Sequence, residues 1–333
     1  MDYVTLPGTE LRCSRVGLGT WSMGGFMWGG ADARDAERTV LAALERGITF
    51  IDSAPVYGLG ASEEMLGRVL EAAGARGRVV LATKAGLEWR GGRIWRNATP
   101  ERLRRELEDS LRRLRTGAID LYQLHWPDPR VPIQEAAEVF AEFHRRGAVR
   151  AIGVSNCTPE EIDVFRQAAP LHAVQPRYNL FERDIEADLL PYCRRHGLPA
   201  LVYSPLCRSL LGGRITAGAR FEEGDLRASD PKFRGPRAPA YLAAVEALGA
   251  FAASRGGRTV AQLALRWALD RPGVGCALLG ARRPEQLGAL DGVDDWRLTE
   301  ADMRAIDECI REFVPDPVGA GLGTPAVREP ERA

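Results

Sequence analysis

Short apolar runs alternate with longer amphipathic stretches along most of the chain. Continuous apolar runs predict buried β-strands, and apolar positions at helical spacing predict amphipathic α-helices. The predicted strands are Arg15–Gly19, Thr49–Asp52, Val79–Lys84, Leu121–His125, Ala151–Ser155, Ala173–Gln175, Ala200–Tyr203 and Gly275–Leu279. The predicted helices include Ala36–Arg46, Glu63–Ala72, Glu101–Leu114, Ile133–Arg146, Pro159–Ala169, Asp184–His196 and Val260–Leu269.

Apolar strands separated by helices indicate a parallel sheet covered by helices. Eight such strand–helix units predict an α/β fold, the closed (β/α)₈ or TIM barrel. The alternative is a doubly wound open sheet, which carries a glycine-rich nucleotide-binding turn after its first strand. Here Gly17-Leu18-Gly19-Thr20-Trp21 lacks the third glycine and the start of a helix. The barrel is therefore the better interpretation.

Segments at both ends extend the predicted barrel. Tyr3–Cys13 predicts an N-terminal β-hairpin that turns at Pro7-Gly8, and Asp302–Arg311 predicts an extra C-terminal helix. We assign residues 1–314 to one barrel domain because no linker interrupts them. Residues 315–333 are rich in proline and glycine, which predicts an irregular tail.

The charge balance argues against several classes of partner. The chain has 45 Lys+Arg and 45 Asp+Glu, so it lacks the basic excess of proteins that bind nucleic acid or anionic membranes. Its apolar runs are too short to span a bilayer, and its first residues do not resemble a signal peptide. The six cysteines are scattered without a C-x-x-C pair. These features predict a cytoplasmic protein with buried free thiols.

Metal sites and serine nucleophiles are not indicated. There are four histidines, without the H-x-x-x-H or H-E-x-x-H spacing of a zinc site. The G-x-S-x-G turn of serine hydrolases does not occur either. We therefore expect no metal.

Polar residues end most of the predicted strands. They are Asp52, Lys84, His125, Ser155 with Asn156, Gln175 and Tyr203. In a (β/α)₈ barrel these strand ends form one rim, which holds the active site. Polar residues are common where strands meet loops, but Asp, Lys and His at three consecutive strand ends favour catalysis. Lysine occurs only at Lys84 and Lys232. Arginine is too bulky to replace the compact point charge of a lysine, so the lysine at position 84 is a candidate functional residue.

These residue types suggest proton transfer to a carbonyl oxygen. Asp52 would supply the counter-charge that a buried Lys84 needs. Tyr57 follows Asp52 closely, and a nearby ammonium is expected to lower the pKa of its phenol from about 10 toward neutral pH. Such a phenol can donate a proton, while His125 hydrogen-bonds the same oxygen.

A hydride source must come from a cofactor, because none of these side chains can supply one. The amide and hydroxyl groups of Ser155, Asn156 and Gln175 suit a carboxamide, and the ring of Tyr203 suits stacking. Arg282-Arg283 follows the last strand and begins a predicted helix, an arrangement that suits phosphate.

Two further features predict the walls of a binding site. Cys207 to Pro239 is a long polar stretch after the seventh strand, and loops of that length are usually functional. We expect it to close over a bound cofactor, with arginines that reach a pyrophosphate: Arg208, Arg214 and Arg220. Four tryptophans follow strand ends and predict an aromatic substrate pocket, or plugs at the barrel mouth: Trp21, Trp28, Trp89 and Trp126.

A series of short motifs passes through these positions. They are Phe50-Ile51-Asp52-Ser53-Ala54-Pro55-Val56-Tyr57-Gly58, Ala82-Thr83-Lys84, Ile119-Asp120-Leu121-Tyr122-Gln123-Leu124-His125-Trp126, Ile152-Gly153-Val154-Ser155-Asn156, Gln175-Pro176-Arg177-Tyr178-Asn179, Tyr203-Ser204-Pro205-Leu206 and Gly280-Ala281-Arg282-Arg283-Pro284-Glu285-Gln286-Leu287. In this order, and over most of the chain, they resemble the aldo-keto reductase superfamily.

The resemblance implies a TIM-barrel oxidoreductase that reduces small-molecule aldehydes or ketones with NADPH. It implies a catalytic tetrad of Asp52, Tyr57, Lys84 and His125. The implied cofactor-binding residues are Gly19, Thr20, Trp21, Asp52, Ser155, Asn156, Gln175 and Tyr203 near the nicotinamide, Ser204, Leu206 and Arg214 at the pyrophosphate, and Gly280, Arg282, Arg283 and Gln286 at the adenosine phosphate. One departure is that Ala289 and Leu290 replace the Glu-Asn pair that holds adenine in many members.

Two other functions fit the same residues. Some members of the superfamily are cofactor-binding regulatory subunits of potassium channels, and steady NADPH turnover with an aldehyde would favour the enzyme. Alternatively, Lys84 would form a Schiff base in an aldolase, which borohydride would trap in the presence of substrate. The sequence indicates neither the physiological substrate nor the oligomeric state.

Overall fold

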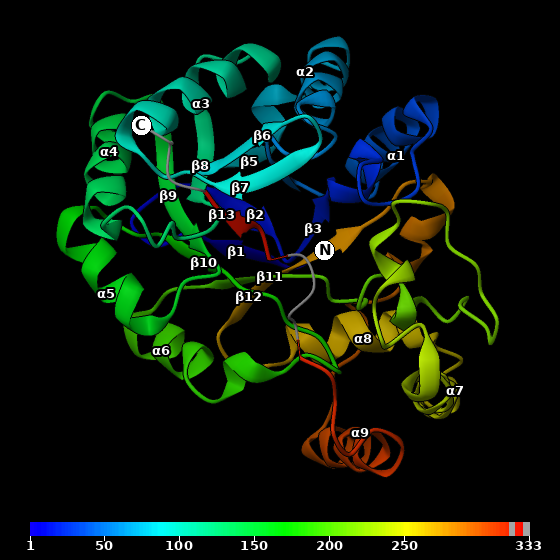
Figure 1. Cartoon of the computed structure of the whole chain (residues 1–333). Helices are drawn as coiled ribbons and strands as arrows, with labels where there is room; N and C mark the ends of the chain where they lie inside the picture. Colours follow the sequence, from blue (N-terminus) through cyan, green and yellow to red (C-terminus); the bar gives the residue numbers. More distant parts are fainter. Residues whose placement is uncertain (320–323, 329–333) are drawn as a thin grey trace.

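The computed structural model describes residues 1–319 and 324–328 and confirms the predicted (β/α)₈ barrel. Eight parallel strands close into a ring at the centre of the molecule (Figure 1). In order round the ring they are β3 (Val16–Gly19), β4 (Phe50–Asp52), β5 (Val80–Ala85), β8 (Ile119–Leu124), β9 (Val149–Ser155), β10 (Ala173–Gln175), β11 (Ala200–Tyr203) and β12 (Val274–Gly280). Each strand neighbours the next in the sequence, as right-handed βαβ units require.

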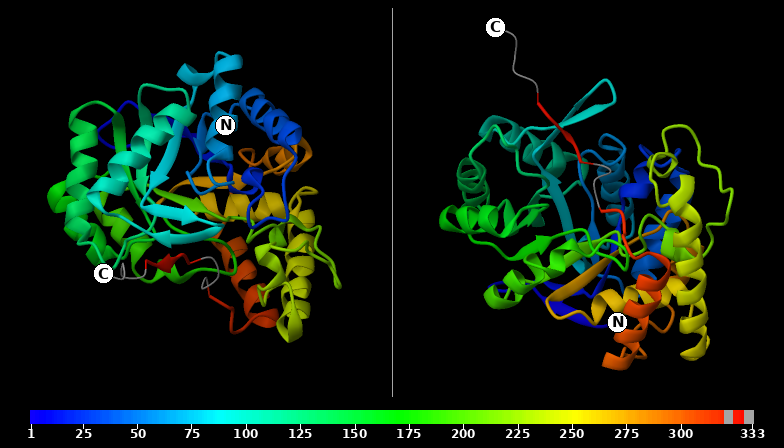
Figure 2. Two further views of the ribbon diagram at one scale, coloured as in Figure 1. Left: turned by 45° about the horizontal axis from the view of Figure 1, so that its top comes forward. Right: turned by 60° about the horizontal axis from the view of Figure 1, so that its bottom comes forward.

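Helices surround the ring on its outer side, which leaves the strands buried on both faces (Figures 1 and 2). They are α1 (Ala33–Glu45), α2 (Ala61–Ala72), α3 (Pro100–Arg113), α4 (Ile133–Arg145), α5 (Pro159–Ala168), α6 (Leu189–His196), α7 (Ala238–Ser254), α8 (Val260–Leu269) and α9 (Glu300–Phe313). Short 3₁₀ helices lie in the loops: η1 (Trp21–Gly24), η2 (Arg76–Arg78), η3 (Asp184–Glu186), η4 (Leu210–Gly212), η5 (Leu226–Ala228), η6 (Gly235–Arg237) and η7 (Pro284–Leu290). None of the helices in residues 1–319 and 324–328 is long and apolar enough to cross a bilayer.

The amino-terminal end of the barrel is closed by the predicted hairpin. Its strands, β1 (Tyr3–Thr5) and β2 (Arg12–Ser14), pair antiparallel. Leu6 and Cys13 pack with the inward-facing side chains of the barrel strands, such as Phe50 and Leu121, in one apolar cluster. Apolar side chains therefore fill this end of the barrel, and the polar residues at the carboxyl ends of the strands lie at the opposite rim.

Two elements near that rim are not predicted by the sequence. β6 (Leu87–Arg90) and β7 (Arg93–Arg96) form a hairpin after β5. The tail that was expected to be irregular contains a short strand, β13 (Ala326–Val327), which pairs parallel with β7. The free edge of β7 supplies the hydrogen-bonding groups that order this segment. In Figures 1 and 2, β13 lies across the mouth of the barrel beside the hairpin.

The long stretch from Cys207 to Pro239 is fixed to the barrel by buried ion pairs. Within it, Arg208 pairs with Asp230, and the Nζ of Lys232 lies 3.0 Å from Oε1 of Glu182 in the loop after β10. Its middle reaches the first loop, where the amide of Leu226 donates to the carbonyl oxygen of Met27 at 3.1 Å. The two loops therefore meet over the rim, and closure on a ligand stays a prediction.

A close backbone contact fixes the first loop against the loop after β4. A Cβ built on Gly24 would lie 2.4 Å from the amide nitrogen of Gly58. Gly58 has φ +63°, and a Cβ there would lie 2.5 Å from the oxygen of Gly24. Neither position can carry a side chain unless the backbone moves.

We predict that Gly24→Ala lowers the free energy of unfolding by about 1–3 kcal/mol, the usual cost of overpacking. Gly77→Ala is the matched control, because a Cβ at Gly77 meets no atom within 4 Å. Urea denaturation of both variants measures the difference. Equal stability of the two would show that the Gly24–Gly58 contact relaxes freely.

Candidate active site

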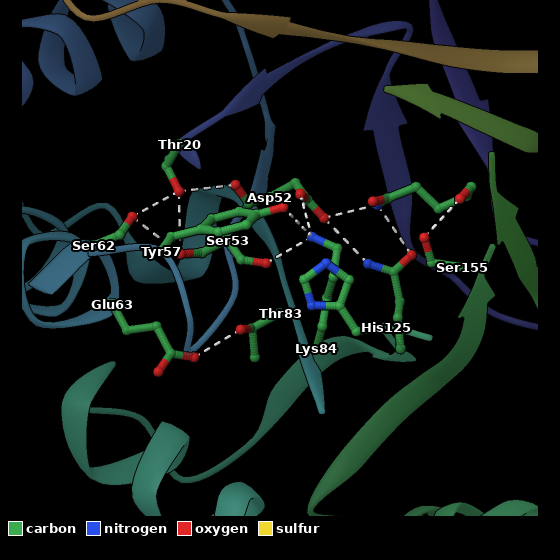
Figure 3. A network of polar contacts seen from close by, with 12 residues as sticks. Thr20, Asp52, Ser53, Tyr57, Ser62, Glu63, Thr83, Lys84, His125 and Ser155 are labelled. Atoms are coloured by element: carbon green, nitrogen blue, oxygen red, sulfur yellow. Dashed lines mark hydrogen bonds and ion pairs between the residues drawn. The ribbon is translucent and has the colours of Figure 1, made fainter. Parts of the chain in front are cut away.

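The predicted catalytic residues come from neighbouring strands and meet at one point of the rim (Figure 3). Asp52 ends β4, Lys84 is the second-last residue of β5, and His125 directly follows β8. β4 pairs with β5, and β5 pairs with β8. Asp52 and Lys84 are almost completely buried, with exposures of 2% and 0%.

The ammonium of Lys84 is fully coordinated by oxygen. Its Nζ donates to Oδ2 of Asp52 at 2.5 Å, to the carbonyl oxygen of Ser53 at 2.8 Å and to the phenol oxygen of Tyr57 at 3.3 Å. An ammonium has three protons to donate, so these contacts use all of them. The charge of Lys84 is thereby satisfied without water.

Buried hydroxyl groups hold the loop that carries Tyr57. Thr20 donates to the carbonyl oxygen of Asp52 at 3.0 Å, and Ser62, at the start of α2, donates to Thr20 at 2.8 Å. Ser53 and Ser62 are linked at 3.2 Å. These contacts, drawn in Figure 3, hold the loop on both sides of Tyr57, at Asp52–Ser53 and at Ser62.

The structure corrects the expected pKa of Tyr57. Lys84 was expected to lower this pKa, but burial raises it well above its ordinary value, and the charges of Asp52 and Tyr203 raise it further. Burial also lowers the pKa of Lys84, against the opposing effects of Asp52 and Glu63. Loss of hydration outweighs the ammonium here. The Tyr57 phenol therefore keeps its proton at neutral pH.

His125 is a neutral hydrogen-bonding group in this site. Burial lowers its pKa well below the ordinary value, and the positive charge of Lys84 lowers it further. Its ring lies edge-on to that of Tyr57, with 6.0 Å between the centroids. A neutral imidazole beside the phenol can orient an oxygen atom without adding charge.

Amide side chains continue the network from Asp52 to the next strands. Oδ1 of Asp52 accepts hydrogen bonds from Nε2 of Gln123 at 3.1 Å and from Nε2 of Gln175 at 2.8 Å. Ser155 donates to the backbone oxygen of Gln175 at 2.7 Å. Nδ2 of Asn156 donates to Ser155 at 3.0 Å, and its Oδ1 accepts from Tyr203 at 2.8 Å. The predicted carboxamide-binding residues are thus joined to the Lys84–Asp52 pair.

Two cavities meet at Tyr57. The first cavity, with about 720 Å³ of empty space, extends from Asp52 and Tyr57 to the end of β12. Its walls include the predicted cofactor residues Gly19, Trp21, Tyr203, Ser204, Leu206, Gly280, Arg282 and Gln286. Gly19 and Gly280 are paired across β3 and β12, and their missing side chains leave room between the strand ends. Rings at one end and guanidinium groups at the other suit a long cofactor with phosphates.

The second cavity, with about 1050 Å³ of empty space, is mostly apolar. Its walls include Tyr57, His125, Trp21, Trp126, Leu87, Ile94 and the tail residues Thr324, Pro325 and Ala326. Ser155, Asn156 and Gln175 also face it. Of the other two tryptophans expected near the site, Trp28 lines the first cavity. Trp89 lies on the β6–β7 hairpin, where its ring packs under the guanidinium of Arg102. This cavity gives a small apolar molecule access to the Tyr57 phenol.

The basic residues near the first cavity differ from expectation. The guanidinium of Arg282 donates to the carbonyl oxygens of Trp28 and Gly30, at 3.0 and 3.2 Å. Arg283 is exposed and lies 3.3 Å from Asp35. Arg214 is exposed and does not line the first cavity. Arg208 does line it.

The helix expected after Arg282-Arg283 is the short 3₁₀ helix η7. The two backbone amides just before η7 are capped by Oε1 of Gln286, which accepts from the nitrogens of Arg282 and Arg283 at 2.7 and 3.1 Å. Ala289 and Leu290 are buried in the core. A phosphate at this end would therefore meet guanidinium groups rather than the backbone amides of Arg282 and Arg283.

Comparison with known proteins agrees with this geometry. The model of the aldo/keto reductase family matches residues 15–311. The chain belongs to the aldo-keto reductase family.

Relatives of this aldo-keto reductase cover nearly its whole length. Aldo-keto reductase YhdN of Bacillus subtilis is 48% identical over 329 residues, which is 99% of each chain. The NADH-specific methylglyoxal reductase of Escherichia coli is 34% identical over 92% of this chain and 98% of its own. Among solved structures, glycerol dehydrogenase AKR11B4 of Gluconobacter oxydans is 45% identical with a TM-score of 0.88, over 97% of this chain and 99% of its own. The family uses nicotinamide cofactors.

Some site residues of this aldo-keto reductase escape sequence reasoning. Gln123 lies inside β8 rather than at its end, although a polar residue two positions before His125 could have indicated it. Ser209 lines the first cavity with φ of 72°, next to Arg208 with φ of 52°, which is one of the three arginines expected to reach a pyrophosphate. Left-handed backbone is uncommon for residues other than glycine, and no sequence pattern marks it here.

We predict that Lys84→Met lowers the free energy of unfolding by about 3–5 kcal/mol, because it leaves the Asp52 carboxylate buried without its counter-charge. The double variant Asp52→Asn/Lys84→Met removes both charges and should recover much of this loss. Urea denaturation of the three proteins provides the test. A double variant less stable than Lys84→Met would show that the ion pair is not the reason for the loss.

Proposed function

We propose that this aldo-keto reductase reduces an aldehyde or ketone to an alcohol, with NADPH as hydride donor and Tyr57 as proton donor. The observation that supports this most is the position of the phenol. Tyr57 lines both cavities and lies 3.3 Å from an ammonium that is itself buried against Asp52. A carbonyl in the second cavity would meet the phenol beside a cofactor in the first.

Tyr57, Lys84 and His125 have separate roles in the proposed proton transfer. Tyr57 holds a proton at its phenol oxygen, because burial raises its pKa. Lys84 stabilises the phenolate that remains after the proton leaves, since its ammonium already contacts that oxygen. His125, neutral and beside the Tyr57 ring, orients the substrate oxygen. A bound nicotinamide would supply the hydride.

The Schiff-base alternative is not favoured. An aldolase lysine needs a free amine lone pair to attack a carbonyl. The Nζ of Lys84 instead makes three hydrogen bonds to oxygen, one of them at 2.5 Å to Asp52. No observation in the described residues favours a regulatory subunit of a channel.

The preference for NADPH over NADH rests on the far end of the first cavity. Burial and the neighbouring guanidinium groups of Arg227 and Arg283 lower the pKa of Arg282. Three guanidinium groups, those of Arg227, Arg282 and Arg283, thus lie there with two carboxylates, since Asp225 pairs with Arg227 and Asp35 with Arg283. A 2′-phosphate, present only in NADPH, would supply the missing negative charge. The family name does not decide this point, because one relative is named as NADH-specific.

We predict that Tyr57→Phe lowers kcat for aldehyde reduction by at least about a hundredfold, the usual scale for a lost general acid. Its Kd for NADPH should change little, because the ring is kept. Steady-state kinetics and fluorescence titration measure the two quantities. Near-normal kcat in Tyr57→Phe would assign the proton to another group.

We predict that Arg282→Ala/Arg283→Ala weakens NADPH binding by about tenfold to several hundredfold and leaves NADH binding nearly unchanged. Each lost charged hydrogen bond is worth roughly 1.5–3 kcal/mol, and the effect should be larger at low salt. Arg112→Ala/Arg115→Ala removes the same charge from exposed positions elsewhere and is the control. Equal weakening of both cofactors would place the phosphate elsewhere.

A further inference from the structure

Lys232 is the second of the two lysines in the chain and has no role in the proton transfer described above. Like Lys84 it is completely buried, although it lies in the long segment between β11 and α7 rather than on a strand. Its Nζ lies 3.0 Å from Oε1 of Glu182 and 3.6 Å from Oδ1 of Asp230. Glu182 and Asp230 are 3% and 0% exposed. The ammonium of Lys232 therefore lies between two buried carboxylates.

Arg208 shares the same two carboxylates. Its guanidinium donates to Oδ2 of Asp230 and lies 3.7 Å from Oε1 of Glu182. Positive and negative groups thus alternate round a closed ring of four buried side chains. Each carboxylate also has a neutral donor. The backbone amide of Lys232 donates to Oδ1 of Asp230 at 2.9 Å, and Nδ2 of Asn179 donates to the other oxygen of Glu182 at 2.7 Å.

Arg208 is also the member of this ring that reaches the first cavity. It lies in the left-handed turn Cys207–Ser209, where φ is 45°, 52° and 72°, and it lines the cavity beside Ser209. A pyrophosphate in that cavity would attract a guanidinium. The side chain of Arg208 is only 2% exposed, because the ring encloses it. Arg208 must therefore turn away from Asp230 to bind a phosphate.

Lys232 makes such a movement possible. Asp230 is completely buried, so its carboxylate needs a cation when Arg208 turns away. Among the described residues, Lys232 is the one other cation within ion-pair distance of Asp230. Glu182 keeps Lys232 at 3.0 Å and Arg177 at 3.8 Å. Neither carboxylate is then left without a counter-charge.

We propose that Lys232 is a positioning residue for Arg208: it compensates the charge of Asp230, so that Arg208 can turn to the pyrophosphate of a bound dinucleotide. The inference rests on the proposed function, since it needs that cofactor in the first cavity. Lysine suits this role because its ammonium is a compact point charge that fits between two carboxylates, whereas the guanidinium of arginine is a larger planar fork.

The test is the Kd for NADPH and for NADH, measured by fluorescence titration. In Lys232→Met, Asp230 has to retain Arg208, and both Kd values should rise by about tenfold to a hundredfold, the scale of one lost charged hydrogen bond. The two factors should agree, because both dinucleotides contain the pyrophosphate. In Asp230→Asn/Lys232→Met the competing carboxylate is gone, and both Kd values should return to within about threefold of the wild type.

Two comparisons separate this role from packing. Arg76→Met is the control, because it removes a guanidinium from an ion pair at the amino-terminal end of β5, away from the rim, and its Kd values should equal those of the wild type. Glu182→Gln/Lys232→Met removes one charge of each sign, as Asp230→Asn/Lys232→Met does, but it leaves Asp230 to hold Arg208. It should bind both dinucleotides at least about tenfold more weakly than Asp230→Asn/Lys232→Met.

The outcomes distinguish this inference from the proposed function. A wild-type protein that binds neither dinucleotide would overturn the proposed function and the inference with it. Tight binding by the wild type with unchanged Kd values in Lys232→Met would overturn the role of Lys232 alone. The same holds if Asp230→Asn/Lys232→Met binds as weakly as Lys232→Met. If Lys232→Met does not fold, equal Kd values in the two double variants would contradict the proposal.

Discussion

The site depends on one buried ion pair, between Lys84 and Asp52. Two charges taken out of water are stable only if nearly every proton and lone pair finds a partner. The loop after β4 supplies Ser53 and Tyr57 for the ammonium, and strands β8 and β10 supply Gln123 and Gln175 for the carboxylate. The polar residues inside an otherwise apolar barrel thus follow from the need to satisfy this pair.

Burial, more than the neighbouring ion pair, decides the protonation of the phenol. Proximity alone would suggest that Lys84 lowers the pKa of the Tyr57 phenol toward neutral pH, and this is the prediction from the sequence. The effect of burial is larger and has the opposite sign, and burial cannot be deduced from spacing along the chain. The ammonium of Lys84, the carboxylate of Asp52 and the neutral phenol of Tyr57 together have no net charge before the proton is transferred.

Sequence reasoning succeeded where the fold determines the position of a residue. Asp52, Lys84 and His125 were found because barrel strands bring their ends to one rim. It failed where irregular backbone determines the outcome. Whether Arg208 or Arg214 reaches the first cavity depends on a left-handed turn at Cys207–Ser209, and the β13 strand depends on an unpaired edge of β7. Gln123 was missed because its signal lies inside a strand.

The closure of the barrel has a consequence for how the protein is made. β12 pairs with β3, and the guanidinium of Arg15 donates to the carbonyl oxygens of Leu269 and Val274. The first barrel strand thus finds its second neighbour only after β12, residues Val274–Gly280, has left the ribosome. Until then its edge is open, and such an edge can pair with other chains. Nascent chains of this enzyme are therefore exposed to aggregation at this edge until β12 has been synthesised.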